Sequence, residues 1–315
     1  MSDKLKIGVF GVGSLGQWHA RIYSELENAE LVGVHDINSE RASEIAATYG
    51  TRAFDSMEEL ATAVDAASIV VPTDKHFGIF KTLVEHDVHL LVEKPITVTT
   101  GEAEAMVSIA TEKGLILQVG HVERFNPVME FLEDSLSLPR FIEATRLAPY
   151  PPPRAEGAPR GTEVSVVLDL MIHDLEIILH IVNSEVKEFH AVGVPVLSPT
   201  EDIANVRLIF ENGCVANVTA SRISQERIRK IRLFQEDTYV SLDYMNQAGQ
   251  ICRKTESGIS ANQVPIEKGE PLAIELASFV ECVRNSSNPV VSGLHGSAAL
   301  ELAVDICKHI RTNPS

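Results

Sequence analysis

The chain is poor in positive charge, and that shortage limits its possible partners. Its 315 residues hold 27 lysines and arginines against 44 aspartates and glutamates, which gives a formal net charge of -17. Binding to a nucleic-acid backbone requires a cationic surface, and no basic tract interrupts the acidic average. We therefore expect no nucleic acid among its partners.

Cysteine is also scarce. The sequence has 4 cysteines, with none before residue 214 and none in a CxxC pair. Neither a disulfide framework nor a zinc site is indicated by that spacing. We expect a reducing, cytoplasmic setting and no bound metal.

The sequence lacks both a leader pattern and an uninterrupted apolar run. Residues 1–20 pass from a mixed-charge start into a strand and a glycine turn, without the pattern of a signal peptide. The most apolar later stretch, Val164–Val182, contains two histidines and three acidic residues, which would be costly in a bilayer. We interpret it as a buried helix of a soluble protein and expect no membrane partner.

What the sequence does have is enough apolar content for two domains, since 44% of its residues are hydrophobic and one core rarely serves a chain of this length. From Leu5 to Val119, short β-branched runs alternate with helical patterns. That rhythm is typical of a parallel sheet covered by helices. We predict an α/β fold with an N-terminal Rossmann domain over residues 1–120.

The rhythm changes after Gly120. One helix is predicted over Val164–Val182, five alternating strand patterns follow it, and two helices over Leu272–Asn285 and Ser297–Ile310 close the chain. Such alternation is typical of antiparallel strands with one solvated face. Residues 121–315 are therefore predicted to form an α+β domain with a mostly antiparallel open sheet.

A glycine-rich turn near the N-terminus follows a predicted strand and opens a predicted helix. In a dinucleotide site the first glycine permits a tight turn, the second lets the pyrophosphate approach the backbone, and the third lets helix and strand pack. Free N–H groups at the helix start receive the phosphates. The predicted cofactor residues of this turn are Gly11, Val12, Gly13, Ser14, Leu15 and Gly16.

Asp36 ends the next predicted strand, 20 residues after Gly16, where an acidic residue accepts the ribose hydroxyls of NAD. A carboxylate there repels a 2'-phosphate, so NAD is favoured over NADP, although Arg41 lies within reach. The alternative is a Rossmann-like domain that binds another nucleotide or none.

Glu93, Lys94 and Pro95 come directly after the apolar strand Val88–Val92. The carboxyl edge of a parallel sheet is where ligands of open α/β folds lie. A lysine there can stabilise a substrate oxygen, and Pro95 can adopt the cis form. The alternative is an exposed lysine that merely ends a strand.

Asp169 and His173 are four residues apart on the predicted helix, so they project from one face. Oxidation of a hydroxyl requires removal of its proton, and an imidazole oriented by a carboxylate suits that step. The alternative is a hydrogen-bonded core histidine. A metal cluster of His173, Glu176 and His180 is not favoured, because no HExxH spacing occurs.

These motifs together resemble the Gfo/Idh/MocA family of sugar and polyol oxidoreductases. The resemblance covers the whole chain and includes Pro72 and Thr73 with His76. It implies that Lys94, Asp169 and His173 are catalytic, and that a homodimer or homotetramer forms through the open sheet of the second domain. It also implies that Thr73, His76 and Glu93 line the nicotinamide side. Further cofactor-binding residues that it implies are Pro72, Lys94 and Arg124.

The segment from Gly120 to Pro127 is similar to the branch of that family that oxidises the 3-hydroxyl of UDP-N-acetylglucosamine. That similarity implies His121, Arg124 and Asn126 as substrate residues beside the catalytic three. Arginines around the proline-rich loop, which are Arg146, Arg154 and Arg160, are candidates for contacting a diphosphate or simply solvate the loop.

We therefore expect an NAD-dependent oxidation of a secondary sugar hydroxyl, with either Lys94 or His173 as the base. Two alternatives remain. One is the same chemistry on myo-inositol or another free sugar or polyol, and the other is a non-catalytic NAD-binding regulator.

Overall fold

The computed structural model describes residues 4–135, 138–152 and 161–313. The chain divides into two compact units. Unit 1 comprises Met1–Phe125 and Glu270–Ser297, and unit 2 comprises Asn126–Gly269 and Ala298–Ser315.

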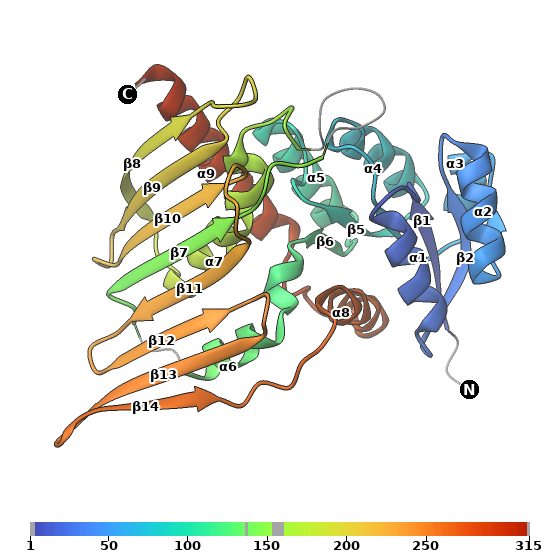
Figure 1. Ribbon diagram of the computed structural model, residues 1–315. Helices are drawn as coiled ribbons and strands as arrows, with labels where there is room; N and C mark the ends of the chain where they lie inside the picture. Colours follow the sequence, from blue (N-terminus) through green and yellow to red (C-terminus); the bar gives the residue numbers. More distant parts are fainter. Residues whose placement is uncertain (1–3, 136–137, 153–160, 314–315) are drawn as a thin grey trace. The chain divides into compact units, whose positions relative to one another are not determined.

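Unit 1 is built on a parallel sheet of six strands in the order β3-β2-β1-β4-β5-β6. Figure 1 labels β1, β2, β5 and β6 of this sheet. This is the strand order of a dinucleotide-binding fold, as the sequence predicts. The strands are β1 (Leu5–Phe10), β2 (Ala29–His35), β3 (Arg52–Ala53), β4 (Ala66–Ile69), β5 (His89–Glu93) and β6 (Leu117–Gly120). The α-helices between them are α1 (Gly16–Glu25), α2 (Ser39–Tyr49), α3 (Met57–Ala61), α4 (His76–Glu85) and α5 (Thr100–Glu112).

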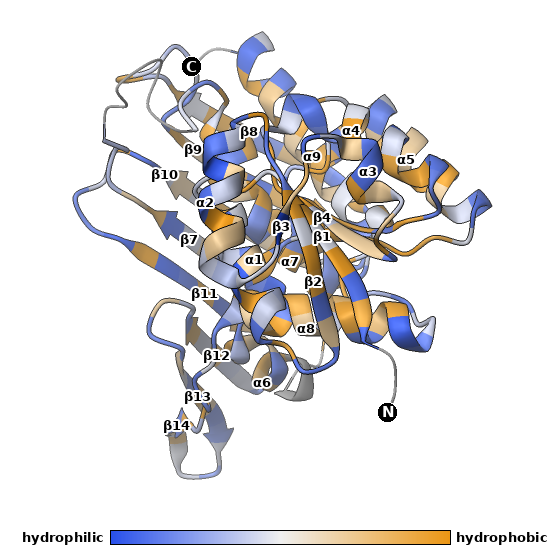
Figure 2. Ribbon diagram, turned by 90° about the vertical axis from the view of Figure 1, so that its right-hand side faces the viewer, coloured by the Kyte–Doolittle hydropathy of each residue, from blue (hydrophilic) through white to orange (hydrophobic). Residues whose placement is uncertain are grey.

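Local signals set several of these helix ends. Asn38 caps α2 by accepting a hydrogen bond from the backbone N–H of Arg41, and the helix ends at Gly50 in the left-handed region. Thr99 and Glu102 form a reciprocal capping box at the start of α5. β1 and β2 run through unit 1 with largely hydrophobic colouring in Figure 2, as strands covered by helices on both faces require.

The helix α8 (Pro271–Asn285) belongs to unit 1, although it follows the whole sheet of unit 2 in the sequence. Its apolar side chains Leu276, Phe279, Val280 and Val283 join the core formed by β1, β2 and α1. The structure thus divides the chain differently from the expected boundary at residues 120 and 121. The reason is that the apolar stripe of α8 is buried on the N-terminal sheet, a long-range pairing that no local pattern encodes.

Unit 2 contains an eight-stranded sheet in the order β14-β13-β12-β11-β7-β10-β9-β8. It is mostly antiparallel, as expected, but β7 and β10 pair in parallel. Three of its strands, β7, β13 and β14, were not among the five expected. The bounds are β7 (Phe141–Leu147), β8 (Val186–Val194), β9 (Ile203–Phe210), β10 (Val215–Ser221), β11 (Ile228–Phe234), β12 (Thr238–Asp243), β13 (Ala248–Thr255) and β14 (Gly258–Val264).

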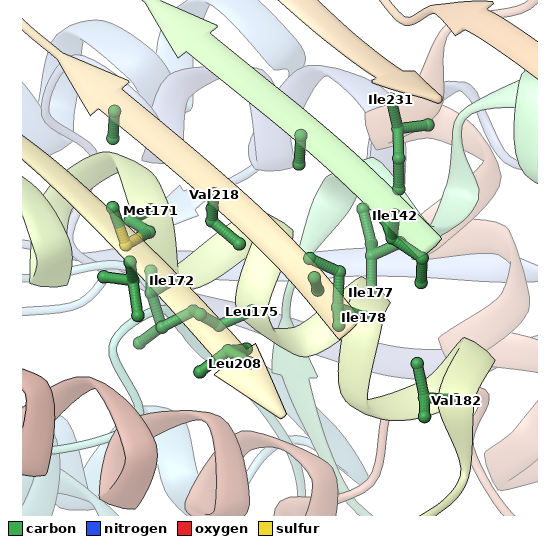
Figure 3. Packing of buried hydrophobic residues seen from close by; sticks show 14 of the residues in the cluster. Ile142, Met171, Ile172, Leu175, Ile177, Ile178, Val182, Leu208, Val218 and Ile231 are labelled. Atoms are coloured by element: carbon green, nitrogen blue, oxygen red, sulfur yellow. The ribbon is translucent and has the colours of Figure 1, made fainter. Parts of the chain in front are cut away.

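One face of this sheet is covered by α7 (Ile172–Val182), and α6 (Pro127–Ser135) and the later part of α9 (Gly293–Thr312) also belong to unit 2. Figure 3 shows Ile172, Leu175 and Ile178 of α7 packed among side chains of the strands, including Val218 and Leu208. Fully burying each such side chain contributes about 1.5–3 kcal/mol, so this face holds α7 firmly.

The long helix expected over Val164–Val182 is not uniform. Val167–Met171 forms a π-helical turn, and the regular α-helix begins only at Ile172. The backbone N–H of Ile172 donates to the carbonyl of Val167, five residues earlier. Such turns are rare and often occur at functional sites. Among the described residues, no helix is long and apolar enough to cross a membrane.

Candidate active site

The glycine turn of unit 1 has the geometry that a dinucleotide requires. Gly11 has a positive φ of 88°, and a Cβ atom there would lie 2.5 Å from the carbonyl oxygen of Val70. A Cβ atom at Gly16 would collide with the carbonyl oxygen of Gly11, whereas Gly13 has open space around it. The turn is therefore closely packed at its first and third glycines and open at the second, where the pyrophosphate must approach.

Asp36 is fixed beside this turn by two backbone hydrogen bonds. Its Oδ2 accepts from the N–H of Val12 at 2.8 Å, and its Oδ1 accepts from the N–H of Asn38 at 2.9 Å. A carboxylate offers about four acceptor positions, so each oxygen retains capacity for a ribose hydroxyl. Asp36 thus helps to shape the turn itself, a role that the spacing alone did not suggest.

Arg41, the residue that left the choice between NAD and NADP open, is already engaged. Its Nε donates to the carbonyl of Val12 at 3.1 Å, its Nη2 donates to Oε1 of Gln17 at 2.8 Å, and its Nη1 pairs with Glu44 at 2.7 Å. These three contacts hold the guanidinium against the turn. They argue against its use as a partner for a 2'-phosphate.

Lys94 lies half-buried at the carboxyl end of β5, and the peptide bond between it and Pro95 is cis. The carboxylate of the preceding Glu93 accepts from the backbone N–H of Lys94 at 3.2 Å. Its other oxygen lies 3.3 Å from Nε2 of His19 on α1. Gly120 makes room for this carboxylate, because a Cβ atom there would lie 2.9 Å from Oε1 of Glu93.

His76 joins the neighbouring turn to the Lys94 loop. Its Nε2 lies 2.9 Å from the carbonyl oxygen of Val71, and its Nδ1 lies 3.1 Å from those of Pro95 and Ile96. Burial, which outweighs the hydrogen bonds, lowers the pKa of His76, so the ring is neutral at neutral pH. Pro72 and Thr73, exposed and half-buried respectively, stand just before it at the edge of the same sheet.

His121 and Arg124 follow β6 at that edge and are both buried. Burial, followed by the charges of Lys94 and Arg124, lowers the pKa of His121 to about 3. Its imidazole is therefore neutral and lies within the electrostatic field of Lys94. His295, which the sequence argument overlooked, also contributes to this field.

Glu275 is a second residue that sequence reasoning missed. It lies on α8, is fully buried, and neither of its carboxylate oxygens has a hydrogen-bond partner among the described residues. Burial and the nearby charge of Glu93 raise the pKa of Glu275 well above its usual value. The signal was an acidic residue within the apolar stripe of the helix formed by Leu276, Phe279 and Val280.

In unit 2, Asp169 lies in the π-helical turn and His173 follows at the start of α7, and both are half-buried. The Asp169 carboxylate packs on the backbone of Gly161, where a Cβ atom would lie 2.5 Å from Oδ2 of Asp169. Gly161 has a positive φ of 82°. Its lack of a side chain is thus what allows this approach.

The remaining predicted substrate residues have structural contacts of their own. The amide of Asn126 donates to the carbonyl of Tyr244 at 3.0 Å and accepts from the N–H of Val128 at 3.3 Å. Arg146 is only 2% exposed and makes a two-point ion pair with Asp174 at 2.7 and 3.0 Å. We withdraw Arg146 as a diphosphate ligand, because its guanidinium is buried in this pair. Arg154 and Arg160 lie outside the described residues.

No group of three potential ligand side chains converges on a common metal position within the described part of the chain. The site residues of unit 1 therefore offer a dinucleotide turn and a lysine at the sheet edge, and those of unit 2 offer an acid and an imidazole one turn apart. That Lys94 and His173 act on one substrate remains a prediction.

Both units of this chain are similar to parts of known proteins. Residues 5–121 match the model of an oxidoreductase family with an NAD-binding Rossmann fold, and residues 134–239 match the Gfo/Idh/MocA C-terminal domain. The chain is 27% identical to a scyllo-inositol 2-dehydrogenase (NAD(+)) of Bacillus subtilis, with 96% of this chain and 93% of that protein covered.

A more similar relative is a UDP-N-acetylglucosamine 3-dehydrogenase of Acidithiobacillus ferrooxidans. The two are 36% identical over 309 residues, which is 96% of each chain. The solved structure of that protein superposes with a TM-score of 0.92 over 98% of both chains. The fold, the cofactor turn and the relatives agree, and this chain belongs to the Gfo/Idh/MocA family of NAD-dependent oxidoreductases.

Proposed function

We propose that this enzyme uses NAD to oxidise the 3-hydroxyl of UDP-N-acetylglucosamine. The observation that carries the choice of substrate is the 36% identity to a UDP-N-acetylglucosamine 3-dehydrogenase over 96% of both chains. The Gly120–Pro127 segment also resembles that branch of the family. Free inositols are the second candidate, because an inositol dehydrogenase matches at 27% identity over nearly the same length.

Lys94, Asp169 and His173 are the proposed catalytic residues. His173 takes the hydroxyl proton, Lys94 stabilises the negative charge that develops on the oxygen, and Asp169 orients the imidazole. Lysine and histidine can exchange these two roles without changing the set. Bound NAD supplies the hydride acceptor at C4 of its nicotinamide.

The other site residues bind rather than react. Backbone N–H groups of the glycine turn would receive the pyrophosphate, and Asp36 would hold the ribose hydroxyls. Thr73, His76 and Glu93 would line the nicotinamide side. His121, Arg124 and Asn126 would lie beside the sugar nucleotide.

A homodimer or homotetramer in the cytoplasm is part of the proposal. The outer face of the unit 2 sheet carries an aromatic cluster in which Phe234 lies 4.7 Å from Tyr239 and 5.6 Å from Phe141, measured between ring centroids. Val192 and Val194 of β8 add 51% and 44% exposed apolar side chains, and a second subunit would cover such a surface. The four free cysteines are compatible with a reducing compartment.

The test compares NADH formation from UDP-N-acetylglucosamine, scyllo-inositol and free N-acetylglucosamine in wild-type and Lys94→Ala proteins. We expect the nucleotide sugar to give the highest kcat/KM. Lys94→Ala should lower kcat by about 100-fold or more while the Kd for NAD changes little. Lys81→Ala, on the exposed side of α4, serves as the control and should behave as wild type.

Three outcomes would each contradict a part of this function. A higher kcat/KM with scyllo-inositol than with the nucleotide sugar would change the assigned substrate, but it would leave the assigned reaction, oxidation of a secondary hydroxyl, unchanged. Near-native turnover of Lys94→Ala would remove the lysine from the mechanism, and NAD binding without oxidation of any tested sugar would favour the regulator.

A further inference from the structure

Arg222, which follows β10 in unit 2, is one of the largest fully buried side chains in the described part of the molecule. A guanidinium has five N–H donors, and five acceptors lie within hydrogen-bond distance of them. These are Oδ1 of Asp202 at 2.8 Å, the carbonyls of Gly161 at 2.6 Å and Val164 at 2.8 Å, and the hydroxyls of Ser198 at 2.9 Å and Thr200 at 2.8 Å. Arg222 is therefore satisfied at every donor.

Asp202 forms the other half of this cluster and is fully buried. Its Oδ2 accepts three backbone hydrogen bonds, from Val196, Leu197 and Ser198, at 2.6 to 2.9 Å. Burial alone would raise the pKa of Asp202, but hydrogen bonds from the Ser198 hydroxyl, Arg222 and the backbone outweigh it and lower the pKa. The pair is thus ionised and rigidly held.

This pair holds the backbone that precedes the π-helical turn. Two of the Arg222 donors go to the carbonyls of Gly161 and Val164. Thr200 adds a second link, because its hydroxyl lies 2.8 Å from the Val164 carbonyl and 3.3 Å from that of Thr162. Neutralising the charge of Arg222 requires only Asp202, which accepts from Nε. The two Nη1 donors instead hold the backbone of residues 161–164 in place.

Asp169 packs directly on that fixed backbone, since a Cβ atom at Gly161 would lie 2.5 Å from its Oδ2. The backbone N–H of Asp169 donates to the carbonyl of Ser165 at 3.1 Å, immediately after the held segment. Both the side chain and the main chain of Asp169 thus depend on where residues 161–165 lie.

We propose that Arg222, together with Asp202 and Thr200, is a positioning group for Asp169 that sets the start of the π-helical turn. Arg222 does not touch substrate. It fixes the carbonyls of Gly161 and Val164, and these fix the carboxylate that orients His173. The inference rests on the catalytic role of Asp169 in the proposed function.

The experiment compares Thr200→Val and Arg222→Lys with a matched control, Thr312→Val. The Thr312 hydroxyl also donates to two backbone carbonyls, at 3.0 and 3.1 Å, but it does so at the end of α9. For each protein we measure kcat and KM with UDP-N-acetylglucosamine, the Kd for NAD, the pH profile of kcat, and hydrogen exchange at the amides of Leu168 and Asp169.

Thr200→Val should lower kcat by about 10- to 100-fold, as a displacement near 1 Å does at a catalytic group. The Kd for NAD should stay within about 2-fold, because affinity is governed by the turn in unit 1. Exchange at Leu168 and Asp169 should accelerate, and the limb of the pH profile that reports the base should shift. Arg222→Lys should lower kcat and accelerate exchange at Leu168 and Asp169 more strongly than Thr200→Val does. Thr312→Val should change neither kcat nor this exchange.

Unchanged exchange and unchanged kcat in folded Thr200→Val would overturn the proposal, whether or not Arg222→Lys folds. A fall in activity that disappears when rates are corrected for the folded fraction would also overturn it. Asp169→Asn separates this failure from that of the proposed function. If Asp169→Asn is inactive while Thr200→Val is fully active, only the positioning role is lost, and if Asp169→Asn is active, the proposed catalytic set is wrong.

Discussion

The Oε1 atom of Glu93 lies 3.3 Å from Nε2 of His19. His19 is on α1, the helix that the glycine turn opens, and Glu93 ends the strand before Lys94. Because Glu93 also accepts from the backbone N–H of Lys94 at 3.2 Å, this contact joins the cofactor turn to the lysine loop. In unit 1, a buried polar contact therefore joins the helix that follows the glycine turn to the loop that carries Lys94.

Replacing His19 by alanine should lower both the stability of the fold and the affinity for NAD. The side chain of Glu93, 10% exposed, would lose the imidazole that lies 3.3 Å from its Oε1, at a cost of about 1–3 kcal/mol in the free energy of unfolding. NAD should also bind more weakly. Urea unfolding and NAD titration measure the two effects, with His86→Ala as the control, because His86 is exposed and directly follows α4. Equal behaviour of the two variants would mean that the contact contributes nothing.

Asp36→Asn should reduce the preference for NAD over NADP. The side-chain amide of the new asparagine keeps one oxygen that can accept from the backbone N–H groups now bound by Asp36. It carries no negative charge, so it no longer repels a 2'-phosphate. We expect the ratio of kcat/KM values to move toward NADP by about 10- to 100-fold, which equals about 1.4–2.8 kcal/mol. Steady-state kinetics with both cofactors test this. The exposed Asp55→Asn should leave the ratio alone, and an unaltered ratio in Asp36→Asn would assign the discrimination elsewhere.

Stability should depend on pH through Glu275. Burial, and then the charge of Glu93, raise the pKa of Glu275 in the folded protein, so the folded state keeps a proton that the unfolded state gives up. The cost is absent below the unfolded pKa near 4.5 and grows as pH rises toward the folded pKa, by at most about 1.4 kcal/mol per pH unit.

Glu275→Gln should therefore raise Tm relative to wild type at pH 8, and the gain should shrink as pH falls toward 5. Glutamine fills the same space and cannot ionise. Thermal unfolding across this range measures the difference, with the exposed Glu104→Gln of α5 as control. A gain that is the same at both pH values would show that the carboxyl is not protonated in the fold.

The glycine turn and its place in the sheet were predictable because their signals are local. Gly11, Gly13 and Gly16 must lie together in sequence to shape one turn, and the parallel order of strands brings Asp36 to the same edge. The position of Lys94 was predictable for the same reason, since β5 ends at that edge.

Residues missed by the sequence argument depend on long-range packing. Arg222 and Gly161 are about 60 residues apart in the chain and meet only through the folded sheet. Glu275 reaches unit 1 because α8 returns to the N-terminal sheet. The sequence pattern of Val164–Val182 predicts one continuous helix and gives no sign of the π-helical turn at Val167–Met171.

The Arg146 and Asp174 pair offers the sharpest contrast between a structural ion pair and a ligand. Their side chains are 3% and 2% exposed, and removing one partner of such a pair typically costs about 3–5 kcal/mol, whereas replacing both by apolar residues is often neutral. Arg146→Met should therefore destabilise strongly, and Arg146→Met with Asp174→Leu should recover most of the loss.

Urea unfolding of the two single variants and the double variant measures that coupling. Arg232→Met serves as the control, because its partner Glu143 is 42% exposed and such surface pairs are worth about 0–1 kcal/mol. A diphosphate ligand would behave in the opposite way, since Arg146→Met would then raise KM for UDP-N-acetylglucosamine while leaving unfolding unchanged. If the double variant recovers stability and KM for UDP-N-acetylglucosamine is unchanged in Arg146→Met, Arg146 belongs to the core and is not a diphosphate ligand.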